Sequence, residues 1–399
     1  MNKQSLITGG LLFCQLMAGA QTSSPDSSSK PITQTDIELV YNQYLQDGNN
    51  SAVTGGIGTE ELQVYGPQLN GKVQKGKGGV SFSVGGDLIT SASTDRIDFI
   101  ISNASSKDIR AYANATYSRK LVKKDVTVEA GAAFSMESDY TSFGSKLGIE
   151  KEDEENLRTW SARVQVFNDD LRWGRLNTID TLILIYPKEL RDTNWIEGFR
   201  RHSVNVKLGL SQAINKRNIV GVYPEFTIQK GVLETPFHRI FFADSSQAVE
   251  QLPEERFKAA LALRWNTFAG GRVILKNSLQ GYGDTFGILG VSFENETVFK
   301  LRPDFSIMAN VRGYAQTGSR YFLPYREHVP ATSFYTSDWD LSSFTNYQLG
   351  LGINFKPFKY LSNRFQFKSV ALRYYYQRRS NGLVAHIFSL ALQGRFRKK

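Results

Sequence analysis

Apolar and polar residues alternate along most of this chain with the two-residue period of a pleated β-strand. The alternation is clearest over residues 126–135, 203–211, 257–266 and 347–356. Over 203–211 one face is apolar and the other is polar or small: Val204, Val206, Leu208 and Leu210 against Ser203, Asn205, Lys207, Gly209 and Ser211. The pattern predicts strands of about ten residues, each with one apolar face, over most of the chain.

The connections between these strands alternate in length. Short ones fall at residues 75–77, 123–125, 153–156, 215–217, 270–271, 302–304 and 358–363. Longer polar ones fall near 47–61, 91–109, 168–200, 230–256 and 319–345, with lesser ones near 136–143, 282–287 and 377–383. A soluble antiparallel sheet also has one apolar and one polar face, but it has no reason to alternate its loops in this way. Tight turns at one end and long loops at the other are typical of outer-membrane barrels.

The sequence therefore predicts an all-β fold, a transmembrane antiparallel β-barrel of about sixteen strands with short periplasmic turns and long extracellular loops. With an even number of strands, the first strand begins and the last strand ends on the same side of the membrane, here the tight-turn side. Aromatic residues gather near the strand ends, which is expected of the girdles at the two membrane interfaces. They are Tyr117, Tyr140, Trp160, Trp265, Tyr347, Tyr374 and Tyr376. Packing inside a soluble core is the competing explanation for these rings.

Residues 1–20 have the pattern of a secretory signal peptide. Lys3 gives the positive region, residues 6–17 the apolar stretch, and Ala18-Gly19-Ala20 the cleavage site. The only cysteine, Cys14, lies within this segment, so the mature chain has no thiol for disulfides, catalysis or metal binding. Residues 21–35 are Ser-rich and predict a flexible periplasmic lead-in, and residues 36–399 form the barrel. A mean hydropathy of −0.33, with no later run of about 18 apolar residues, excludes a polytopic helical membrane protein.

Several loop and strand-end stretches resemble one bacterial protein family. They are residues 47–61 (DGNNSAVTGGIGTEE), 91–98 (SASTDRID), 105–108 (SSKD), 235–239 (TPFHR) and 334–342 (FYTSDWDLS). On these, the chain resembles the family called Domain of Unknown Function 3570, found in Bacteroidota and some proteobacteria, over nearly its whole mature length. The resemblance implies an outer-membrane barrel and provides no catalytic or binding residues to carry over. It also suggests a link to envelope redox or flavin-attachment systems.

The polar strand faces predict a charged interior in which bases outnumber acids. The bases are Arg163, Lys207, Lys258, Arg264, Lys276, Arg312, Lys356, Arg373 and Arg395, and the acids are Asp87, Glu129, Glu225, Glu294 and Glu296. A water-filled lumen of this sign favours anions, because charged walls set selectivity. Alternatively, the charges pair across strands and pack the interior, or the long loops fold inward and close it. The sequence leaves both an open and an occluded lumen possible.

Two loops are rich in the oxygen-bearing residues that hard cations prefer. The candidate calcium ligands are Asp47, Asn49, Ser51, Glu60, Asp95, Asp98 and Asp108. The EF-hand template does not fit, because Ala52 and Gly58 stand where a glycine and a bidentate acid are needed. The alternative is a Gly- and Asn-rich loop held by its own backbone hydrogen bonds. No cofactor other than this Ca²⁺ is expected.

Little in the chain points to catalysis. The histidines are His202, His238, His328 and His386. They form no metal-binding motif, and no G-x-S-x-G nucleophile motif occurs. His238 and His328 fall in long loops, where solvated side chains are expected. A hydrolase at the barrel rim would use loop residues such as His328, Asp338 and Asp340, but no motif supports it, and the chain is expected not to be an enzyme.

The formal charge is +10 at pH 7, from 48 lysines and arginines against 38 acids. These bases are scattered instead of forming a stripe with stacked aromatics, which argues against a nucleic-acid partner. Bases in the tight turns suit the head groups of outer-membrane lipid. The sequence thus favours an outer-membrane pore or solute-binding barrel for a small polar or anionic solute. The alternatives are a non-conducting scaffold with a periplasmic envelope partner, such as a redox or flavin-linked protein, and a loop-borne hydrolase.

Overall fold

The computed structural model describes residues 33–48, 60–94, 107–121, 125–137, 140–171, 200–234, 239–357 and 360–398. Strands account for most of these residues, which also include one short 3-10 turn, η4 (Trp339–Leu341). Within these ranges, no helix is long and apolar enough to span a membrane. The predicted signal peptide, most of the lead-in and the loop residues 49–59, 95–106 and 172–199 lie outside the described part of the chain.

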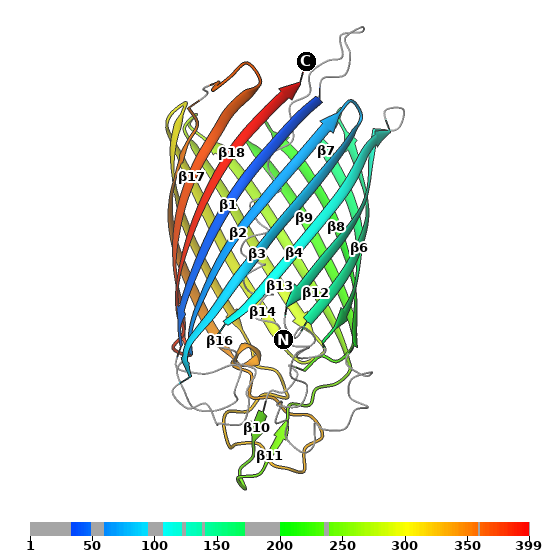
Figure 1. The fold of residues 1–399 in the computed structure, drawn as a ribbon, viewed down its shortest axis with the longest axis vertical. Helices are drawn as coiled ribbons and strands as arrows, with labels where there is room; N and C mark the ends of the chain where they lie inside the picture. The colour runs from blue at the N-terminus through cyan, green and yellow to red at the C-terminus, as the bar shows by residue number, and fades with distance from the viewer. Residues whose placement is uncertain are drawn as a thin grey trace.

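Sixteen strands form one closed antiparallel barrel (Figure 1). β9 pairs directly with β12, and β18 closes the barrel against β1. The barrel strands are β1 (Thr33–Asp47), β2 (Glu60–Lys75), β3 (Gly78–Thr94), β4 (Lys107–Leu121), β5 (Val126–Glu137), β6 (Tyr140–Asp153), β7 (Arg158–Asp170), β8 (Arg200–Asn215), β9 (Asn218–Gly231), β12 (Glu255–Ala269), β13 (Val273–Asp284), β14 (Leu289–Arg302), β15 (Phe305–Gln316), β16 (Phe344–Phe355), β17 (Phe365–Arg379) and β18 (Val384–Lys398). β10 (Arg239–Phe241) and β11 (Gln247–Val249) form a separate two-stranded sheet. The predicted all-β barrel is confirmed.

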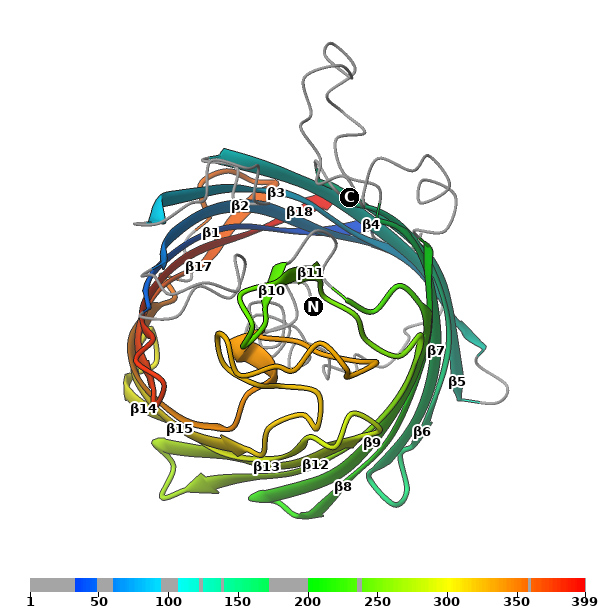
Figure 2. The ribbon, with the colours of Figure 1, turned by 90° about the horizontal axis from the view of Figure 1, so that it is seen from below.

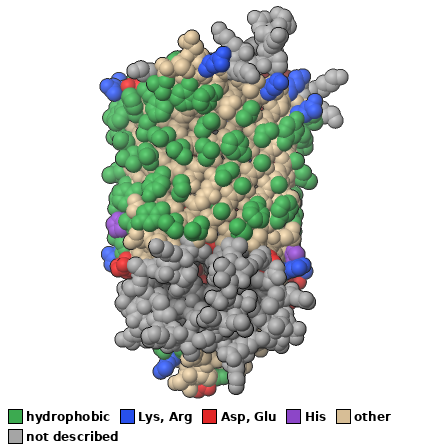
Figure 3. All heavy atoms as spheres, viewed as in Figure 1, with side chains coloured by type: hydrophobic (Ala, Val, Ile, Leu, Met, Phe, Trp, Pro, Cys, Tyr) green, Lys and Arg blue, Asp and Glu red, His purple; other side chains and the backbone are tan. Residues whose placement is uncertain are grey.

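The two faces of the barrel strands divide as the alternation predicts. In β8, Leu208 is 42% exposed on the outside, whereas Lys207 points inward and its Nζ lies 3.3 Å from Glu225 Oε1. Exposed apolar side chains cover a broad band of the outer wall (Figure 3). A closed barrel leaves no unpaired strand edge, and an apolar exterior is one that lipid solvates. The exterior is therefore that of an outer-membrane barrel.

Tight turns and long connections lie at opposite ends of the barrel, as predicted. β1 begins and β18 ends at the tight-turn end, where Thr33 pairs with Lys398. The connections after β9 and after β15 leave the other end and extend over the barrel opening (Figures 1 and 2). β1 begins before the end of the predicted lead-in at residue 35, because pairing with β18 and β2 continues beyond the apolar stretch.

Outward-facing aromatic rings mark both ends of the wall. Trp160 and Trp265 are exposed near the tight turns. Near the long-loop end, the rings of Tyr347 and Tyr376 lie 6.2 Å apart on neighbouring strands. The side chain of Tyr140 lies outside the described residues. Rings on the outer surface at both strand ends match interfacial girdles and not a soluble core.

Candidate functional site

Two parts of the molecule form the surfaces that a solute entering the barrel would contact. One is the inner wall, formed by the polar faces of the strands. The other is a group of connections at the long-loop end, the described residues 232–234 and 239–254 with 285–288 and 317–343, which pack on one another. We call these three segments the cap. In the end-on view they lie within the outline of the barrel (Figure 2).

On one part of the wall, from β18 through β1 to β9, inward bases lie against acids. Three of these bases, Arg163, Lys207 and Arg395, were predicted, and the other three were missed. The pairs are Arg110 with Asp87 at 3.4 Å, Lys146 with Glu129 at 3.9 Å, Arg163 with Glu129, Arg201 with Asp169 at 2.8 Å, Lys207 with Glu225 at 3.3 Å, and Arg395 with Asp36 at 2.6 Å. These pairs join neighbouring or next-neighbouring strands. They neutralise this part of the wall without adding much stability, because exposed ion pairs are worth little.

The wall from β12 to β17 is more basic. Glu296 serves two bases, with Lys276 Nζ at 2.7 Å and Arg373 Nη1 at 3.9 Å. The Arg264 guanidinium lies 4.5 Å from the centroid of the Tyr223 ring. Glu294 accepts a 2.8 Å hydrogen bond from Asn310 Nδ2. The basic balance predicted for the lumen is thus concentrated in these six strands.

Lys356 differs from the other predicted lumen bases. β16 ends one residue earlier, at Phe355, and Lys356 is exposed in the turn that follows. Its backbone N–H donates to the Asp304 carbonyl at 2.7 Å, so the turn holds it at the tight-turn end. The alternation was extended one residue too far, and Lys356 lies at the barrel end and not on the wall.

Glycines on the wall allow large inward-facing side chains to lie flat. A Cβ added to Gly221 would meet the Tyr223 ring at 2.6 Å, and one added to Gly85 would meet the Tyr112 ring at 2.5 Å. The Tyr375 ring occupies the same kind of position above Gly350. Because the rings fill the space that a Cβ would take, they run along the wall instead of projecting towards the barrel axis.

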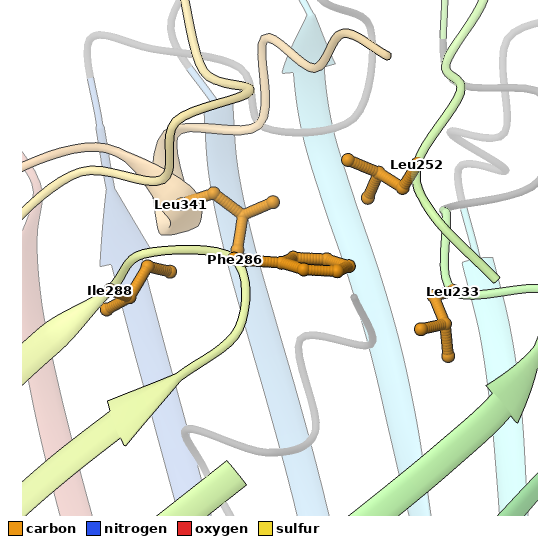
Figure 4. Close-up of a cluster of buried hydrophobic side chains, with 5 residues drawn as sticks. All are labelled: Leu233, Leu252, Phe286, Ile288 and Leu341. Carbon is orange, nitrogen blue, oxygen red and sulfur yellow. The ribbon is translucent and has the colours of Figure 1, made fainter. Parts of the chain in front are cut away.

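The cap has an apolar core of its own. Phe286 from the β13–β14 turn contacts Leu341 of η4, with Ile288 on one side and Leu233 and Leu252 on the other (Figure 4). Phe286 and Leu341 are each 1% exposed. The core draws residues from all three cap segments, so it fixes the segments relative to one another.

A second apolar cluster joins β10 to the connection after β15. It contains Ile240, Phe242 and Tyr335. His328 lies against Phe242 and Tyr335, is 2% exposed, and its Nε2 donates to the Thr336 carbonyl at 2.9 Å. The prediction of a solvated loop histidine is wrong for His328, because apolar neighbours far away in the sequence cover it.

Two arginines tie the cap to the barrel wall. Arg379, at the end of β17, donates from Nη1 to Asp340 Oδ1 at 2.6 Å and from Nη2 to the Trp339 carbonyl at 3.1 Å. Arg256, near the start of β12, pairs with Asp284, which also receives the backbone N–H of Phe286 at 2.9 Å. Both pairs are buried. The cap is therefore anchored to the strands by charge-assisted hydrogen bonds as well as by apolar packing.

Asp338 is a buried carboxyl group of the cap, and its pKa lies near neutrality. It is 3% exposed, and its Oδ1 accepts the Asp340 backbone N–H at 2.8 Å. Burial, and then the negative charges of Asp340 and Glu250, raise the pKa of Asp338 to about 7. The sequence analysis named this residue within the stretch 334–342 and as a residue of a hypothetical rim hydrolase, but nothing in the sequence indicated its burial.

The loop-borne hydrolase and the candidate ion site find little geometric support. His328, Asp338 and Asp340 direct their hydrogen bonds to Thr336, to η4 and to Arg379, and not to one another. Asp47 is exposed at the end of β1. Asn49, Ser51, Asp95, Asp98 and His238 lie outside the described residues, as do the side chains of Glu60 and Asp108. Within the described part, no three His, Cys, Asp or Glu residues are grouped as metal ligands.

The remaining two histidines face outward near the long-loop end. His202 Nδ1 donates to Asn168 Oδ1 at 2.7 Å. His386 Nδ1 and the Tyr374 hydroxyl are hydrogen-bonded at 2.8 Å, and the Tyr376 ring contacts the imidazole. Both side chains therefore belong to the outer aromatic and polar rim and not to the inner wall.

A family model described as a protein of unknown function, DUF3570, matches residues 25–395. The chain belongs to the DUF3570 family. The match spans every barrel strand and the whole cap, so barrel and cap together are the DUF3570 unit. No match was found among curated proteins.

Several solved barrels share the architecture of this DUF3570 protein at very low identity. Pseudomonas aeruginosa OccK1 (OpdK) is 8% identical with a TM-score of 0.41, over 92% of this chain and 99% of that one. A BenF-like porin from Pseudomonas fluorescens Pf-5 is 10% identical with a TM-score of 0.43, over 92% and 99%. A bacterial polysaccharide outer membrane secretin is 11% identical with a TM-score of 0.45, over 93% and 100%. Likeness this distant says nothing about which solute a DUF3570 barrel accepts.

Proposed function

We propose that this protein is an outer-membrane pore that passes small polar solutes, with a preference for anions. The tight turns and both termini of the chain face the periplasm, and the cap faces the outside. The proposal assigns the barrel no catalytic role and no cofactor. Its environment is outer-membrane lipid, in contact with the apolar band.

The observation that carries the proposal is the construction of the inner wall. Sixteen strands enclose more space than side chains alone fill. Large rings such as Tyr112, Tyr223 and Tyr375 lie flat over glycines instead of extending inward. The wall is lined by charged and amide side chains, which a lumen without water would leave poorly solvated. These three features support a wet interior.

The test is single-channel recording of the refolded protein in a planar bilayer, with heat-modifiable gel mobility as the check of folding. Steady currents with higher permeability to chloride than to potassium are the expected result. Currents that favour potassium would contradict the anion preference. A folded barrel that stays silent at all voltages would contradict the pore itself.

The cap favours one alternative, a barrel that is closed at rest and holds a partner. Its apolar core and the buried Arg379–Asp340 and Arg256–Asp284 pairs give it the packing of a small folded unit. A silent barrel that conducts once residues 317–343 are removed would support a closed pore. One that remains silent after this deletion would support the scaffold, with a periplasmic envelope protein as the partner to seek.

A further inference from the structure

The charged residues of the inner wall are not equally satisfied around the barrel. From β18 through β1 to β9, the described inward bases lie against carboxylates, except Lys72 near the tight turns, which lies opposite Asp36 in the register without a described ion pair. Between β12 and β17, two inward bases, Lys258 and Arg312, have no described ion-pair or hydrogen-bond partner. The acid opposite Lys258, Asp284, already accepts several donors, and the acid opposite Arg312, Glu294, bonds Asn310 instead.

Arg312 lies on β15 between Glu294 of β14 and Gln348 of β16 in the strand register. Glu294 Oε1 accepts from Asn310 Nδ2 at 2.8 Å, and Gln348 Nε2 donates to Asn310 Oδ1 at 3.1 Å. Asn310 therefore engages both cross-strand neighbours of Arg312. The Arg312 Nε is buried, and among the described residues it has no hydrogen-bond acceptor.

Lys258 lies on β12 opposite Asp284 of β13. The two oxygens of Asp284 already receive five donors, namely the backbone N–H groups of Phe286 and Ile288, the Tyr282 hydroxyl, and Nε and Nη2 of Arg256. A carboxylate with this many donors has no lone pair left for another ammonium group. Lys258 thus stands two residues from the point where Arg256 holds the cap, and among the described residues it has no carboxylate free to pair with it.

The strand register places the two bases one below the other along the same part of the wall. Arg312 shares a row across the sheet with Glu294, Ser278 and Arg264. Lys258 lies six positions before Arg264 on β12, towards the cap, which corresponds to roughly 20 Å along the strand. Lys276 and Arg373, which share Glu296, lie beyond the Arg312 row, towards the tight turns. A solute moving inward from the cap passes Lys258 before Arg312.

We propose that small anions with a carboxylate or phosphate group follow the inner wall of β12–β17 and contact Lys258 and then Arg312. This inference rests on the proposed pore function. An unpaired base on a low-dielectric wall concentrates counter-ions locally, and two such bases in sequence let an anion move from one to the next. The paired wall opposite attracts anions less, so the permeation path is off-centre.

The first test compares chloride-over-potassium permeability in planar bilayers for the wild type, Lys258→Gln and Arg312→Gln. Each substitution is expected to lower the ratio by about twofold or more, because one unpaired charge is lost from the path. Arg312→Lys keeps the charge and is expected to retain the wild-type ratio. The double variant Lys207→Gln/Glu225→Gln removes a paired couple without changing net charge, and it is the matched control that leaves the ratio unchanged.

Wild-type ratios in conducting Lys258→Gln and Arg312→Gln channels would overturn the inference while leaving the pore intact. If the wild-type barrel does not conduct, the pore fails, and titration calorimetry with inorganic pyrophosphate decides the anion path separately. Saturable heat in the folded wild type and in Lys207→Gln/Glu225→Gln, absent in Lys258→Gln/Arg312→Gln, supports it. Equal heats in all three proteins, or none in the wild type, reject it.

Discussion

Single residues on the inner wall decide how much of the barrel stays open. Gly221 and Gly350 lie beneath the Tyr223 and Tyr375 rings, and each position would clash with its ring if it carried a Cβ. A larger residue at such a position forces the ring off the wall. Small residues thus control the orientation of large rings on the same strand, as in β9, or on the next one, as between β16 and β17.

Two adjacent residues of β8 point to opposite sides of the barrel wall, so substitutions at them are expected to affect stability differently. Leu208→Arg places a charge on the lipid face at mid-strand and is expected to destabilise the barrel by about 2–4 kcal/mol. Lys207→Gln leaves one wall carboxylate, Glu225, in contact with water, and is expected to change stability by about 1 kcal/mol or less. Urea unfolding of protein refolded in lipid bilayers measures both. Equal losses from the two substitutions would show that the facing of β8 is misassigned.

Asp338 makes cap docking depend on pH. Its ordinary pKa of 3.8 is raised to about 7 in the docked cap by burial, with Asp340 and Glu250 adding to the effect and Arg379 neutralising Asp340. Because docking raises the pKa, its contribution is fully present below about pH 4 and is lost as the pH rises through about 7. Hydrogen-exchange protection factors of residues 317–343, which correct for the intrinsic pH dependence of amide exchange, are therefore expected to fall between about pH 4 and 7.

Asp338→Asn is the matched variant for this effect. An asparagine oxygen still accepts the Asp340 N–H that Asp338 accepts, but it does not titrate. Protection of the cap in this variant is expected to vary much less over the same pH range. The role of Asp338 is refuted if the variant loses protection with pH as steeply as the wild type does.

At the scale of elements, the cap packs at the end of the barrel, but the pairing of the strands does not depend on it. Its apolar core joins η4, the β13–β14 turn and the connection after β9, and each of these begins and ends at a barrel strand. The barrel hydrogen bonds continue beneath it without interruption. Loss of the cap core should therefore loosen the cap while the sixteen strands stay closed.

Leu341→Ala tests this separation. Leu341 is 1% exposed, and the cavity left by its truncation costs about 2–5 kcal/mol, all of it from the cap. Proteolysis within residues 317–343 is expected to become faster, with the gel mobility of the folded barrel unchanged. Leu323→Ala, in the same segment but 41% exposed, is the control and should leave proteolysis near the wild-type rate. A shift of the barrel to unfolded mobility would show that cap and barrel are one cooperative unit.

At the scale of the whole molecule, the sequence predicts the barrel well and the cap poorly. The alternation over 203–211 and 257–266 falls within β8 and β12, and the turn positions agree with the structure. The strands are longer than the predicted ten residues, because beyond the lipid both faces are polar and the alternation fades. In the cap, Leu252 and Leu341 are isolated apolar residues in polar stretches. These residues come together only in the folded chain, so no periodic pattern in the local sequence predicts their cluster.

The candidate site divides in the same way. Which wall residues are basic follows from strand facing, and the sequence predicted most of them. Which bases are already neutralised depends on the register between strands, since Glu294 lies opposite Arg312 but binds Asn310. Register is a property of strand pairs and not of one strand's pattern.

The seam between β1 and β18 pairs every residue of β1, from Thr33 with Lys398 to Asp47 with Val384. The two strands that close the circle are thus separated by all the others along the chain. During biogenesis β1 leaves the export machinery first and then waits with one open edge until β18 arrives. An open edge is a template for aggregation, and contacts between such distant segments form slowly. Chaperones must therefore protect the chain until its full length has been exported. A chain truncated before β18 lacks the strand that closes the barrel.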